Sequence, residues 1–348
     1  MTESKERMRV AYFVSSYRCG EQMLRLVRRL QHLDPDGTIV IHHDEFGRDP
    51  LDRRPFDELG VTVLTSPFSI NWGDLTLDRA RWRVFGWILE HLDVDWVVLL
   101  SEQCYPISPM ADLHRRLAAT PGDAIFFGWP IDECPLPQVR EDFRLRYYYQ
   151  YRALPRLPGV AALPAPLRRL VRTGVVGVSE LVNRVVPGVR VYNGDRATGS
   201  PTRLGVRSRG RLFSAAFPCW ANGTWGALTP TAMRAVLDHL DEHPEYERYY
   251  ARTVIPVESA TLTILFNHPD LTVENASLHA IRWSRPLTGR PDVYTKDDLE
   301  HLVAAPEPFA RKFSDADSAL LDALDARIDG AVTSGRAGGR GSAGSAAS

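Results

Sequence analysis

The chain has 348 residues, 44% of them hydrophobic, and a formal net charge of −1 at pH 7. This length allows two packed units or one large α/β domain with a sizeable core. The near-zero charge excludes a global attraction to nucleic acid or anionic lipid, so any basic site must be local.

The N-terminal third alternates strands and helices. Apolar runs predict strands at Arg9–Val14, Thr38–Ile41, Val61–Leu64 and Asp95–Leu100, with helices at Glu21–Leu33 and about Leu77–Leu92 between them. This order predicts a mainly parallel sheet, whose ligands collect at the carboxyl ends of its strands. The segments expected at that edge are Ser15–Tyr17, His42–Asp44 and Ser101–Pro106.

The middle of the chain, about Ile131 to Phe217, loses this rhythm. It carries the aromatic cluster Tyr147–Tyr151, a Pro/Ala/Leu stretch and a Gly/Arg/Ser-rich run. We interpret it as an insertion with helices and a mobile loop, which could shape the binding site of a second substrate. The tyrosine cluster is equally compatible with ligand stacking and with a core or interface patch.

Regular patterning returns after residue 217. We expect a strand at Trp225–Thr229, helices at about Thr231–Glu242 and Val257–Phe266, a strand near His279–Trp283 and a helix beginning at Thr295. The last nineteen residues, 330–348, are mostly Gly, Ala, Ser and Arg. They should be disordered because they offer little apolar surface to offset ordering entropy.

Cysteine spacing and the N-terminus bear on the compartment. The four cysteines lie far apart without a CxxC spacing, so we expect free thiols rather than a zinc site or a disulfide framework: Cys19, Cys104, Cys134 and Cys219. No signal peptide is evident, and no run reaches the roughly 18 apolar residues of a membrane span. A cytoplasmic protein is therefore expected.

Six short strings occur in an order shared with a known enzyme family. They are Ile41-His42-His43-Asp44, Asn71-Trp72-Gly73-Asp74, Leu100-Ser101-Glu102-Gln103-Cys104-Tyr105-Pro106, Gly223-Thr224-Trp225-Gly226-Ala227-Leu228-Thr229, Pro256-Val257-Glu258 with Thr263, and Phe309-Ala310-Arg311-Lys312-Phe313. In this order the chain resembles the core-2/I-branching β-1,6-N-acetylglucosaminyltransferase family, glycosyltransferase family 14, which includes peptide O-xylosyltransferases and plant glucuronosyltransferase-like members. The resemblance covers about residues 8–117 and 218–328.

The resemblance implies a GT-A-type glycosyltransferase fold, an α/β architecture with a mainly parallel central sheet flanked by helices and an irregular middle insertion. Residues 1–130 would form the nucleotide-sugar-binding half, 131–217 the insertion, 218–329 the catalytic and acceptor-side half, and 330–348 the tail. The implied activity is an inverting, metal-independent transfer of a sugar, GlcNAc first, from a UDP-sugar to a hydroxyl of a saccharide or glycosylated small molecule.

Two alternative functions stay open and a third is excluded. A UDP-xylose-dependent transferase and a catalytically silent carbohydrate- or nucleotide-binding protein of the same fold both stay open. A Rossmann-type oxidoreductase is excluded because no GxGxxG follows the first strand.

Glu258 is the expected general base, since a single carboxylate can take the proton of the attacking hydroxyl. Its alternative role is a carboxylate in the first turn of the following helix, favoured there by the macrodipole. The resemblance assigns stabilisation of the leaving diphosphate to Lys312, with Arg311 and Arg290 as further candidates. A solvated basic turn is the alternative for Arg311 and Lys312.

No metal or cofactor is expected. Asp93-Val94-Asp95 precedes its strand, whereas a metal-holding Asp-x-Asp would follow one, so we interpret both aspartates as an exposed turn. Donor-side candidates at the strand exits are Asp44, His42 and Cys104. For Asp44 a turn aspartate bonding its own backbone is an equal alternative, and for the histidines a structural role is favoured.

Trp72, Trp225 and Trp283 are the candidates for stacking on sugar rings, although most tryptophans should be core residues. Four positions depart from the family pattern: Cys104 replaces a common aspartate, Glu102 a glycine, Tyr17 a histidine, and Val257 the aspartate of P-D-E. These departures bear on which sugar the donor carries.

Overall fold

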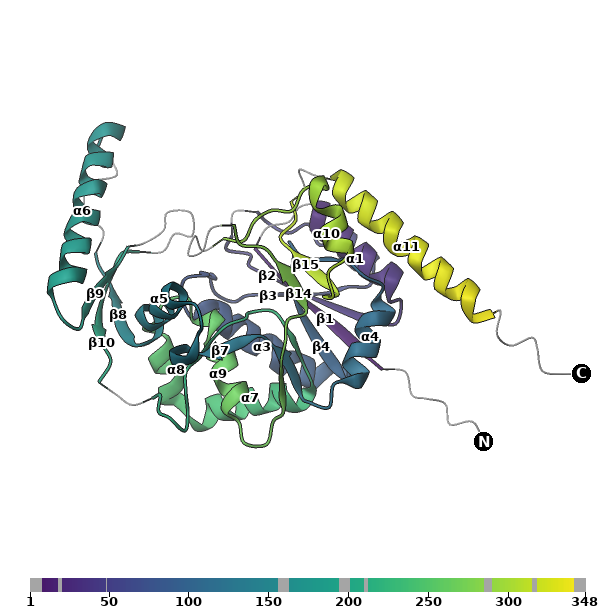
Figure 1. Cartoon of the computed structure of the whole chain (residues 1–348), viewed down its shortest axis with the longest axis horizontal. Coiled ribbons are helices and arrows are strands. Elements are labelled where there is room, and N and C mark those ends of the chain that lie inside the picture. Colours follow the sequence, from purple (N-terminus) through teal and green to yellow (C-terminus); the bar gives the residue numbers. More distant parts are fainter. Residues whose placement is uncertain are drawn as a thin grey trace, which may run out of the picture.

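The computed structural model describes residues 8–17, 21–47, 49–155, 163–193, 201–209, 212–284, 290–314 and 318–340. A seven-stranded sheet forms its centre (Figure 1). In spatial order the strands are β13 (Val273–Asn275), β6 (Ala124–Phe126), β12 (Ala227–Leu228), β4 (Trp96–Ser101), β1 (Val10–Ser16), β2 (Thr38–His43) and β3 (Thr62–Thr65). Only β12 runs antiparallel to its neighbours among these strands. The predicted α/β fold with a mainly parallel central sheet is confirmed.

The alternation of side chains along β1 divides the core into two layers. Val10, Tyr12 and Val14 face one layer, whereas Ala11 and Phe13 face the other. The first layer is covered by α1 (Glu21–Leu33), α2 (Arg54–Glu58), α4 (Met110–Ala119), α10 (Leu299–Val303) and α11 (Ser318–Arg340). The second is covered by α3 (Thr76–His91), α7 (Pro230–Glu242), α8 (Pro244–Tyr250) and α9 (Ala260–Asn267).

A smaller sheet brings the end of the chain to the exit of β4. Its strands are β14 (His279–Ile281), β15 (Phe309–Arg311) and β5 (Tyr105–Pro106), in that order. Next to it, the Phe313 N–H donates to the Gln103 carbonyl at 3.0 Å. Residues 310–313 therefore lie beside the carboxyl edge of the central sheet, where the ligands of α/β folds collect.

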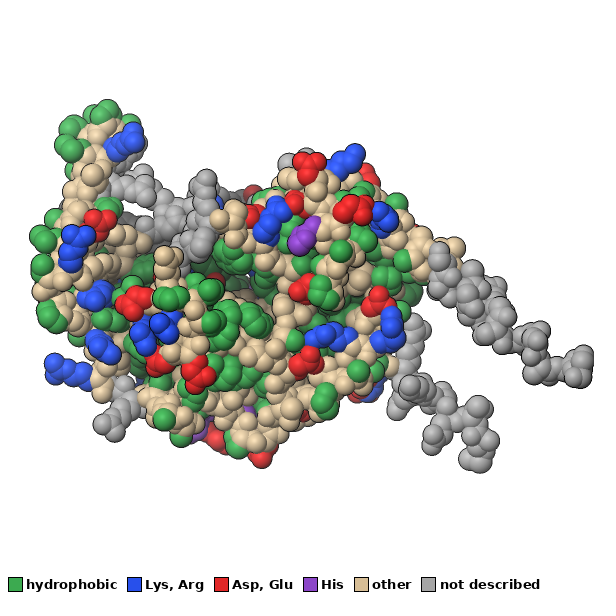
Figure 2. Space-filling view, viewed as in Figure 1, with side chains coloured by type: hydrophobic (Ala, Val, Ile, Leu, Met, Phe, Trp, Pro, Cys, Tyr) green, Lys and Arg blue, Asp and Glu red, His purple; other side chains and the backbone are tan. Residues whose placement is uncertain are grey.

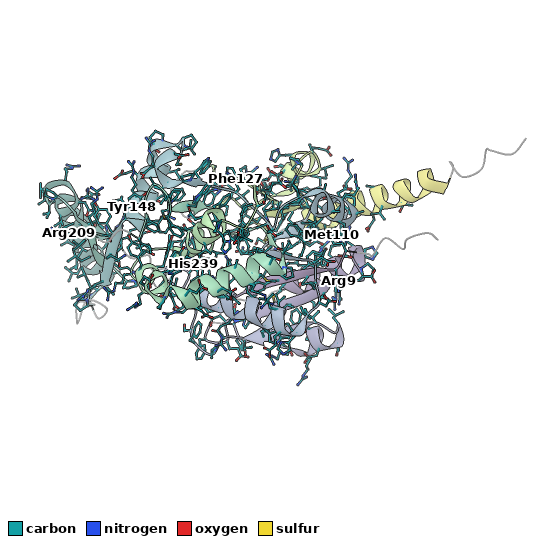
Figure 3. The ribbon with its side chains drawn as sticks, turned by 90° about the horizontal axis from the view of Figure 1, so that it is seen from below. Arg9, Met110, Phe127, Tyr148, Arg209 and His239 are labelled. Atoms are coloured by element: carbon teal, nitrogen blue, oxygen red, sulfur yellow. The ribbon has the colours of Figure 1, made fainter. Side chains whose placement is uncertain are left out.

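The middle region is more regular than the sequence predicts. It holds η1 (Ile131–Glu133) and α5 (Pro137–Tyr147), followed by a three-stranded antiparallel sheet of β8 (Tyr149–Ala153), β10 (Arg203–Arg207) and β9 (Val189–Tyr192), with α6 (Ala165–Val185) between β8 and β9. β7 (Gly128–Pro130) and β11 (Trp220–Asn222) pair separately. Figure 3 shows the part labelled Tyr148 and Arg209 at one end of the molecule and α11 at the other. The prediction of helices is confirmed, but this sheet was missed because its strands are short and rich in arginine.

Several boundaries differ from prediction. The helix expected over about Val257–Phe266 splits into the 3-10 turn η3 (Pro256–Glu258) and α9, and the helix expected from Thr295 begins with η4 (Lys296–Asp298). α11 continues to Arg340, so the structure assigns a helix to 330–340 despite four glycines there, where a disordered tail was expected from residue 330. Residues 341–348 lie outside the described residues.

Two further findings concern thiols and helices. Cys104, Cys134 and Cys219 are free and buried, as expected, whereas Cys19 lies outside the described residues. In the part of the chain that the structure describes, no helix has the length and apolar character to cross a bilayer.

Candidate active site

The turn that carries Glu258 is built on an unusual backbone. Ile255 has φ 53° and ψ 54°, a left-handed conformation that is rare for a β-branched residue. Its N–H donates to the Gly73 carbonyl at 3.2 Å, and its carbonyl accepts the Tyr147 hydroxyl at 2.9 Å. These bonds from two distant segments hold the strained residue, and backbone strain of this kind concentrates at functional sites.

Glu258 is held by an arginine from α5. Arg146 Nη1 donates to Glu258 Oε2 at 2.7 Å, and Arg146 also pairs with Asp142 at 2.5 Å. Among the described residues this is the only hydrogen bond to the Glu258 carboxylate, so no bond to the first turn of α9 is seen. Burial raises the pKa of Glu258 above its ordinary value, while Arg146 opposes the rise and Asp142 adds to it.

A buried hydroxyl network fixes the junction between this turn and α9. Ser259 Oγ donates to the Trp220 carbonyl at 2.7 Å, and Thr263 Oγ1 accepts the Trp220 N–H at 2.9 Å. The Tyr250 hydroxyl lies 2.8 Å from Ser259 Oγ and donates to Thr263 Oγ1 at 3.2 Å. Thr263 therefore positions the turn structurally rather than facing a ligand.

Arg311 is stacked on Trp225. Its guanidinium carbon lies 4.5 Å from the centroid of the indole, and that of Arg81 lies 5.7 Å from the same ring. Arg81 is buried, and its Nε and Nη2, like Arg311 Nε, have no hydrogen-bond partner among the described residues. Burial lowers the pKa of Arg81 to about 10, Asp78 opposes this, and Arg311 lowers the pKa further. Two guanidinium groups thus lie next to one indole ring. Both have nitrogen atoms without a hydrogen-bond partner among the described residues.

The charge of Arg311 reaches several neighbouring groups. It favours ionisation of Glu258 and of the Cys104 thiol, and it lowers the pKa of His279 to about 3 together with the larger effect of burial. Cys104 itself is fully buried, with burial raising its pKa. The Cys104 thiol is thus part of the core in this structure, and a contact between Cys104 and a donor stays a prediction.

The other candidate residues of the C-terminal segment differ in their surroundings. Lys312 follows Arg311, and its carbonyl accepts the Tyr294 N–H at 3.0 Å. Trp283 lies two residues beyond β14 and is 47% exposed, which leaves its ring open to stacking. Arg290 is exposed and follows residues 285–289, which lie outside the described residues. Roles for these three in ligand binding stay predictions.

At the exit of β2 the polar side chains serve the protein backbone. Asp44 accepts the Phe46 N–H at 3.1 Å through Oδ1 and the Ile70 N–H at 3.2 Å through Oδ2. The turn-aspartate alternative thus describes the contacts of Asp44 in this structure. His43 bonds Ser16 Oγ and the Asp49 carbonyl, so it is the structural histidine that was expected. Burial lowers the pKa of His42 to about 4, which keeps it neutral.

The segment around Trp72 joins these two parts of the site. Ile70 is bonded to Asp44, and Gly73 accepts the N–H of Ile255 at 3.2 Å. Trp72 is partly buried against the small cluster that includes Ile255 and Val257. It therefore supports the Glu258 turn by packing.

The N-terminal part of the chain is similar to a known protein family. Residues 10–145 match the family model described as Branch, Core-2/I-Branching enzyme. This segment belongs to the core-2/I-branching enzyme family. The match includes Asp44, Trp72 and Cys104 and ends immediately before Arg146, whereas Glu258 and Arg311 lie outside it.

Two similar proteins come from Arabidopsis thaliana. The beta-glucuronosyltransferase GlcAT14B is 30% identical over 135 residues, which are 37% of this chain and 31% of that protein. The beta-glucuronosyltransferase GlcAT14A is 30% identical over 118 residues, 33% of this chain and 26% of that protein. The matched region thus spans less than a third of either relative.

A solved structure is also similar to part of the chain. It is the mannosyltransferase PcManGT from Pyrobaculum calidifontis in complex with GDP-Man and Mn2+, with a TM-score of 0.26 and 15% identity over 41% of this chain and 39% of that one.

The family resemblance implies an aspartate at the position of Val257. Val257 is fully buried beside Tyr149, Tyr151, Val254 and Ile255. The position immediately before Glu258 therefore contributes apolar packing, and the counterion of Glu258 comes from α5.

Carboxylate clusters suited to a metal are absent from the described ranges, where no group of three or more His, Cys, Asp or Glu side chains has a suitable arrangement. Asp95 accepts the backbone N–H of Arg9 at 2.7 Å, and Asp93 pairs with the Arg9 guanidinium. Asp93 is exposed and Asp95 partly exposed in the segment before β4, and both pair with Arg9. Independence from metals stays a prediction.

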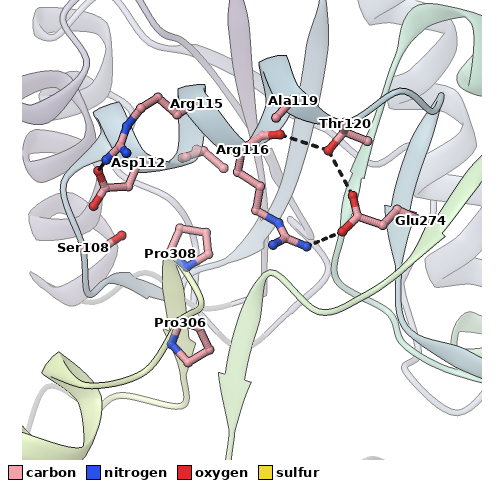
Figure 4. A pocket seen from close by; sticks show the side chains of 10 residues that line it. Ser108, Asp112, Arg115, Arg116, Ala119, Thr120, Glu274, Pro306 and Pro308 are labelled. Carbon is pink, nitrogen blue, oxygen red and sulfur yellow. Dashed lines mark hydrogen bonds and ion pairs between the residues drawn. The ribbon is translucent and has the colours of Figure 1, made fainter.

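A surface hollow lies apart from this candidate site. Arg116 pairs with Glu274 across it, and Thr120 Oγ1 donates to Glu274 Oε2 at 3.0 Å (Figure 4). Its wall also includes Ser108 and Pro308, and none of the candidate site residues lines it. Arg116 and Glu274 neutralise each other's charge here, although Arg116 Nε has no hydrogen-bond partner among the described residues.

Sequence reasoning missed Arg146, Arg81 and Asp78. Arg146 is 112 residues from Glu258, and no local spacing predicts such a pair. Arg81 and Asp78 lie on α3, which was expected only to pack. The one available signal was the presence of two charged residues at i, i+3 on a helix whose remaining buried face is apolar.

Proposed function

We propose that this protein is an inverting glycosyltransferase that uses a nucleotide-sugar donor. Glu258 takes the proton of an acceptor hydroxyl while that oxygen forms a bond to the anomeric carbon. The bond between this carbon and the phosphate oxygen breaks, and its electron pair leaves with the nucleoside diphosphate. The donor is UDP-linked and the acceptor is a hydroxyl of a saccharide or glycosylated small molecule, as the family resemblance implies.

The environment of Glu258 is the observation that carries this proposal. A general base works best when its pKa lies near the working pH, and burial raises the pKa of Glu258 in that direction. Arg146 fixes one carboxylate oxygen, which leaves the other to accept a proton. The Arg146 bond thus orients the base without occupying its second oxygen.

Arg311 and Lys312 are proposed to stabilise the charge that develops on the leaving diphosphate. Arg311 supports this role because its Nε lacks a hydrogen-bond partner among the described residues and its side chain is ordered against Trp225. Fixed cations in this position would do the work that a divalent ion does in other transferases, which makes activity in EDTA part of the proposal.

GlcNAc and xylose are the donor sugars that the family resemblance implies, and the present chain favours a further candidate. Two relatives are named beta-glucuronosyltransferases, whose donor sugar would carry a carboxylate. Arg81 and Arg311 repel each other across Trp225, and an anionic group beside Arg311 would relieve that repulsion. We therefore include UDP-glucuronic acid as a third donor candidate.

Replacement of Glu258 by Gln tests the reaction. The wild type should release UDP from a UDP-sugar in EDTA, and Glu258→Gln should lose about 10²-fold or more in rate. Glu247→Gln is the matched control, since Glu247 is a partly exposed carboxylate paired with Arg79 on the surface. Equal turnover of Glu258→Gln and wild type would remove Glu258 from the mechanism. UDP binding without turnover of any donor would identify a silent binding protein.

The donor sugar can be tested with UDP-glucose and UDP-glucuronic acid, which differ only at C6. If Arg311 contacts the carboxylate, UDP-glucuronic acid should be preferred and Arg311→Gln should abolish the preference. If Arg311 contacts only the diphosphate, the variant should lower the turnover of both donors equally. Turnover of UDP-GlcNAc or UDP-xylose in preference to both would favour the donors implied by the family.

A further inference from the structure

The charge of this chain is distributed very unevenly. Residues 149–211, here called the arginine-rich lobe, contain twelve arginines, no lysine and two acidic residues, a net charge of +10. The whole chain carries −1, so the remainder carries −11. The near-neutral total therefore conceals a strongly cationic segment. Its described elements β8, α6, β9 and β10 lie at one end of the molecule (Figures 1 and 3).

The helix of this lobe exposes an apolar stripe. Leu167, Leu170, Val178, Leu181 and Val185 of α6 are between 50% and 67% exposed. Together with Gly174, they follow one another at spacings of three and four residues, which places them on one helical face. A side chain added at Gly174 would meet nothing within 4 Å. Figure 2 shows α6 projecting from the body with hydrophobic and basic side chains on its surface.

The opposite face of α6 is anchored, so the direction of the stripe is fixed. Asn183 bonds the backbone of Val191 in β9 through both ends of its amide, at 2.6 and 3.1 Å. Ser179, one turn earlier, donates to Asn193 Oδ1 at 3.1 Å. Rotation of the helix to bury the stripe against β9 would break these bonds.

Exposed apolar side chains are concentrated in the lobe. Of fifteen large hydrophobic residues exposed in the described chain, nine belong to it, and the other six are spread over the rest. Apart from the stripe, the lobe's members are Leu154, Val186, Leu204 and Val206. Exposure of this kind beside positive charge is typical of a surface that binds a partner.

The positive charge and the exposed apolar side chains of the lobe together indicate which partner binds there. Pairing of two lobes through their stripes would bring together two segments of +10 each, which is unfavourable. Docking of the lobe on the acidic remainder of a second copy would satisfy the charge but would meet few apolar side chains. A bilayer with anionic headgroups satisfies both, because an amphipathic helix buries its apolar face at the headgroup boundary while arginines contact the lipid phosphates.

We propose that the arginine-rich lobe docks on an anionic membrane surface, with α6 lying in the interface through its Leu167 to Val185 stripe. Arg184 is exposed at the flank of the stripe and would contact headgroups, whereas the exposed Arg169 lies nearer the anchored face. Docking is independent of the proposed transfer reaction, since no donor or catalytic residue takes part in it.

Flotation of the whole protein with vesicles tests the proposal. Vesicles of phosphatidylcholine with about 30% phosphatidylglycerol should bind the protein at low salt, with binding weakened by high salt and by omission of the anionic lipid. Leu170→Asn with Leu181→Asn should lower partitioning at least about tenfold. Arg184→Gln should lower it about fivefold on anionic vesicles.

Leu136→Asn is the matched control, because Leu136 is 52% exposed and lies outside the lobe. It should bind vesicles as the wild type does, and all variants should keep the thermal unfolding midpoint. Absence of binding to anionic vesicles at low salt, or wild-type binding by the double leucine variant, would overturn the proposal. If light scattering shows a dimer for the wild type and a monomer for the double leucine variant, the proposal would be overturned in favour of a second copy of the chain.

Discussion

Arg146 Nη1 lies 2.7 Å from Glu258 Oε2 and connects α5 of the middle region to the proposed catalytic turn. The arginine is 10% exposed and the glutamate 20%, so the pair is largely withdrawn from solvent. Within this pair the charge of Arg146 limits the rise in the Glu258 pKa that burial causes. The middle region is thus part of the site and not only an insertion beside it.

Arg146→Ala should raise the pKa of Glu258 further, because the largest effect opposing burial is lost while Asp142 continues to raise it. The base is active when deprotonated, so the acidic limb of the kcat/KM profile should move to higher pH. Loss of one partner of a buried pair should also cost about 3 kcal/mol of unfolding free energy. Both are measurable, by donor turnover against pH and by urea unfolding.

Arg144→Ala is the control for that variant, since Arg144 belongs to the same helix and pairs with the exposed Asp132. It should leave the pH profile in place and change stability by less than about 1 kcal/mol. An acidic limb that stays at the wild-type pH in Arg146→Ala would show that Arg146 does not tune the base.

Arg311→Gln should weaken the binding of UDP but not that of uridine. The proposed contact is to the diphosphate, and a charge-assisted hydrogen bond contributes about 1.5–3 kcal/mol, so a loss of about 10- to 100-fold in UDP affinity is expected. Calorimetry with both ligands makes the comparison, and Arg282→Gln serves as control because Arg282 is paired with Asp298 and Asp292. An equal loss for uridine would place Arg311 away from the phosphates.

Asp78 should make stability depend on pH. Burial raises its pKa from 3.8 to about 7, with Arg81 opposing and Asp74 adding to the rise. The folded state therefore binds more protons than the unfolded state between about pH 4 and 7, and stability falls as pH rises through this window. Its contribution to the slope is at most about 1.4 kcal/mol per pH unit.

Asp78→Asn should remove that contribution, which urea unfolding at several pH values between 5 and 7 would measure. Asp112→Asn, at a partly exposed carboxylate on α4, should retain the wild-type slope. A wild-type slope in Asp78→Asn would mean that Asp78 stays ionised throughout the range.

Thr263→Val should destabilise the junction between the Glu258 turn and α9. It leaves the Trp220 N–H and part of the Ser259–Tyr250 network without a partner, at a cost of about 2 kcal/mol. Thr263→Ser retains the hydroxyl and should lose about 1 kcal/mol or less for the missing methyl group. Equal losses for the two variants, measured by chemical unfolding, would show that packing and not hydrogen bonding holds the junction.

Local pattern in the sequence determined the alternation of β1, α1, β2 and β4 and the strings around Glu258 and Arg311. Strand and helix periodicity arises from neighbours within a few residues, so it is readable without the fold. The same reasoning failed for the sheet of the arginine-rich lobe, whose short strands are stabilised by pairing across loops and not by local preference.

Tertiary structure alone decided which charges meet. The counterion of Glu258 comes from α5, the indole beneath Arg311 comes from the segment before β12, and Cys104 turns into the core although its strand ends at the ligand edge. Such contacts join residues far apart in the chain, and their energies depend on burial and on distance in space. The sequence by itself determines the elements and the available side chains, but only the packed fold determines which of them are desolvated together.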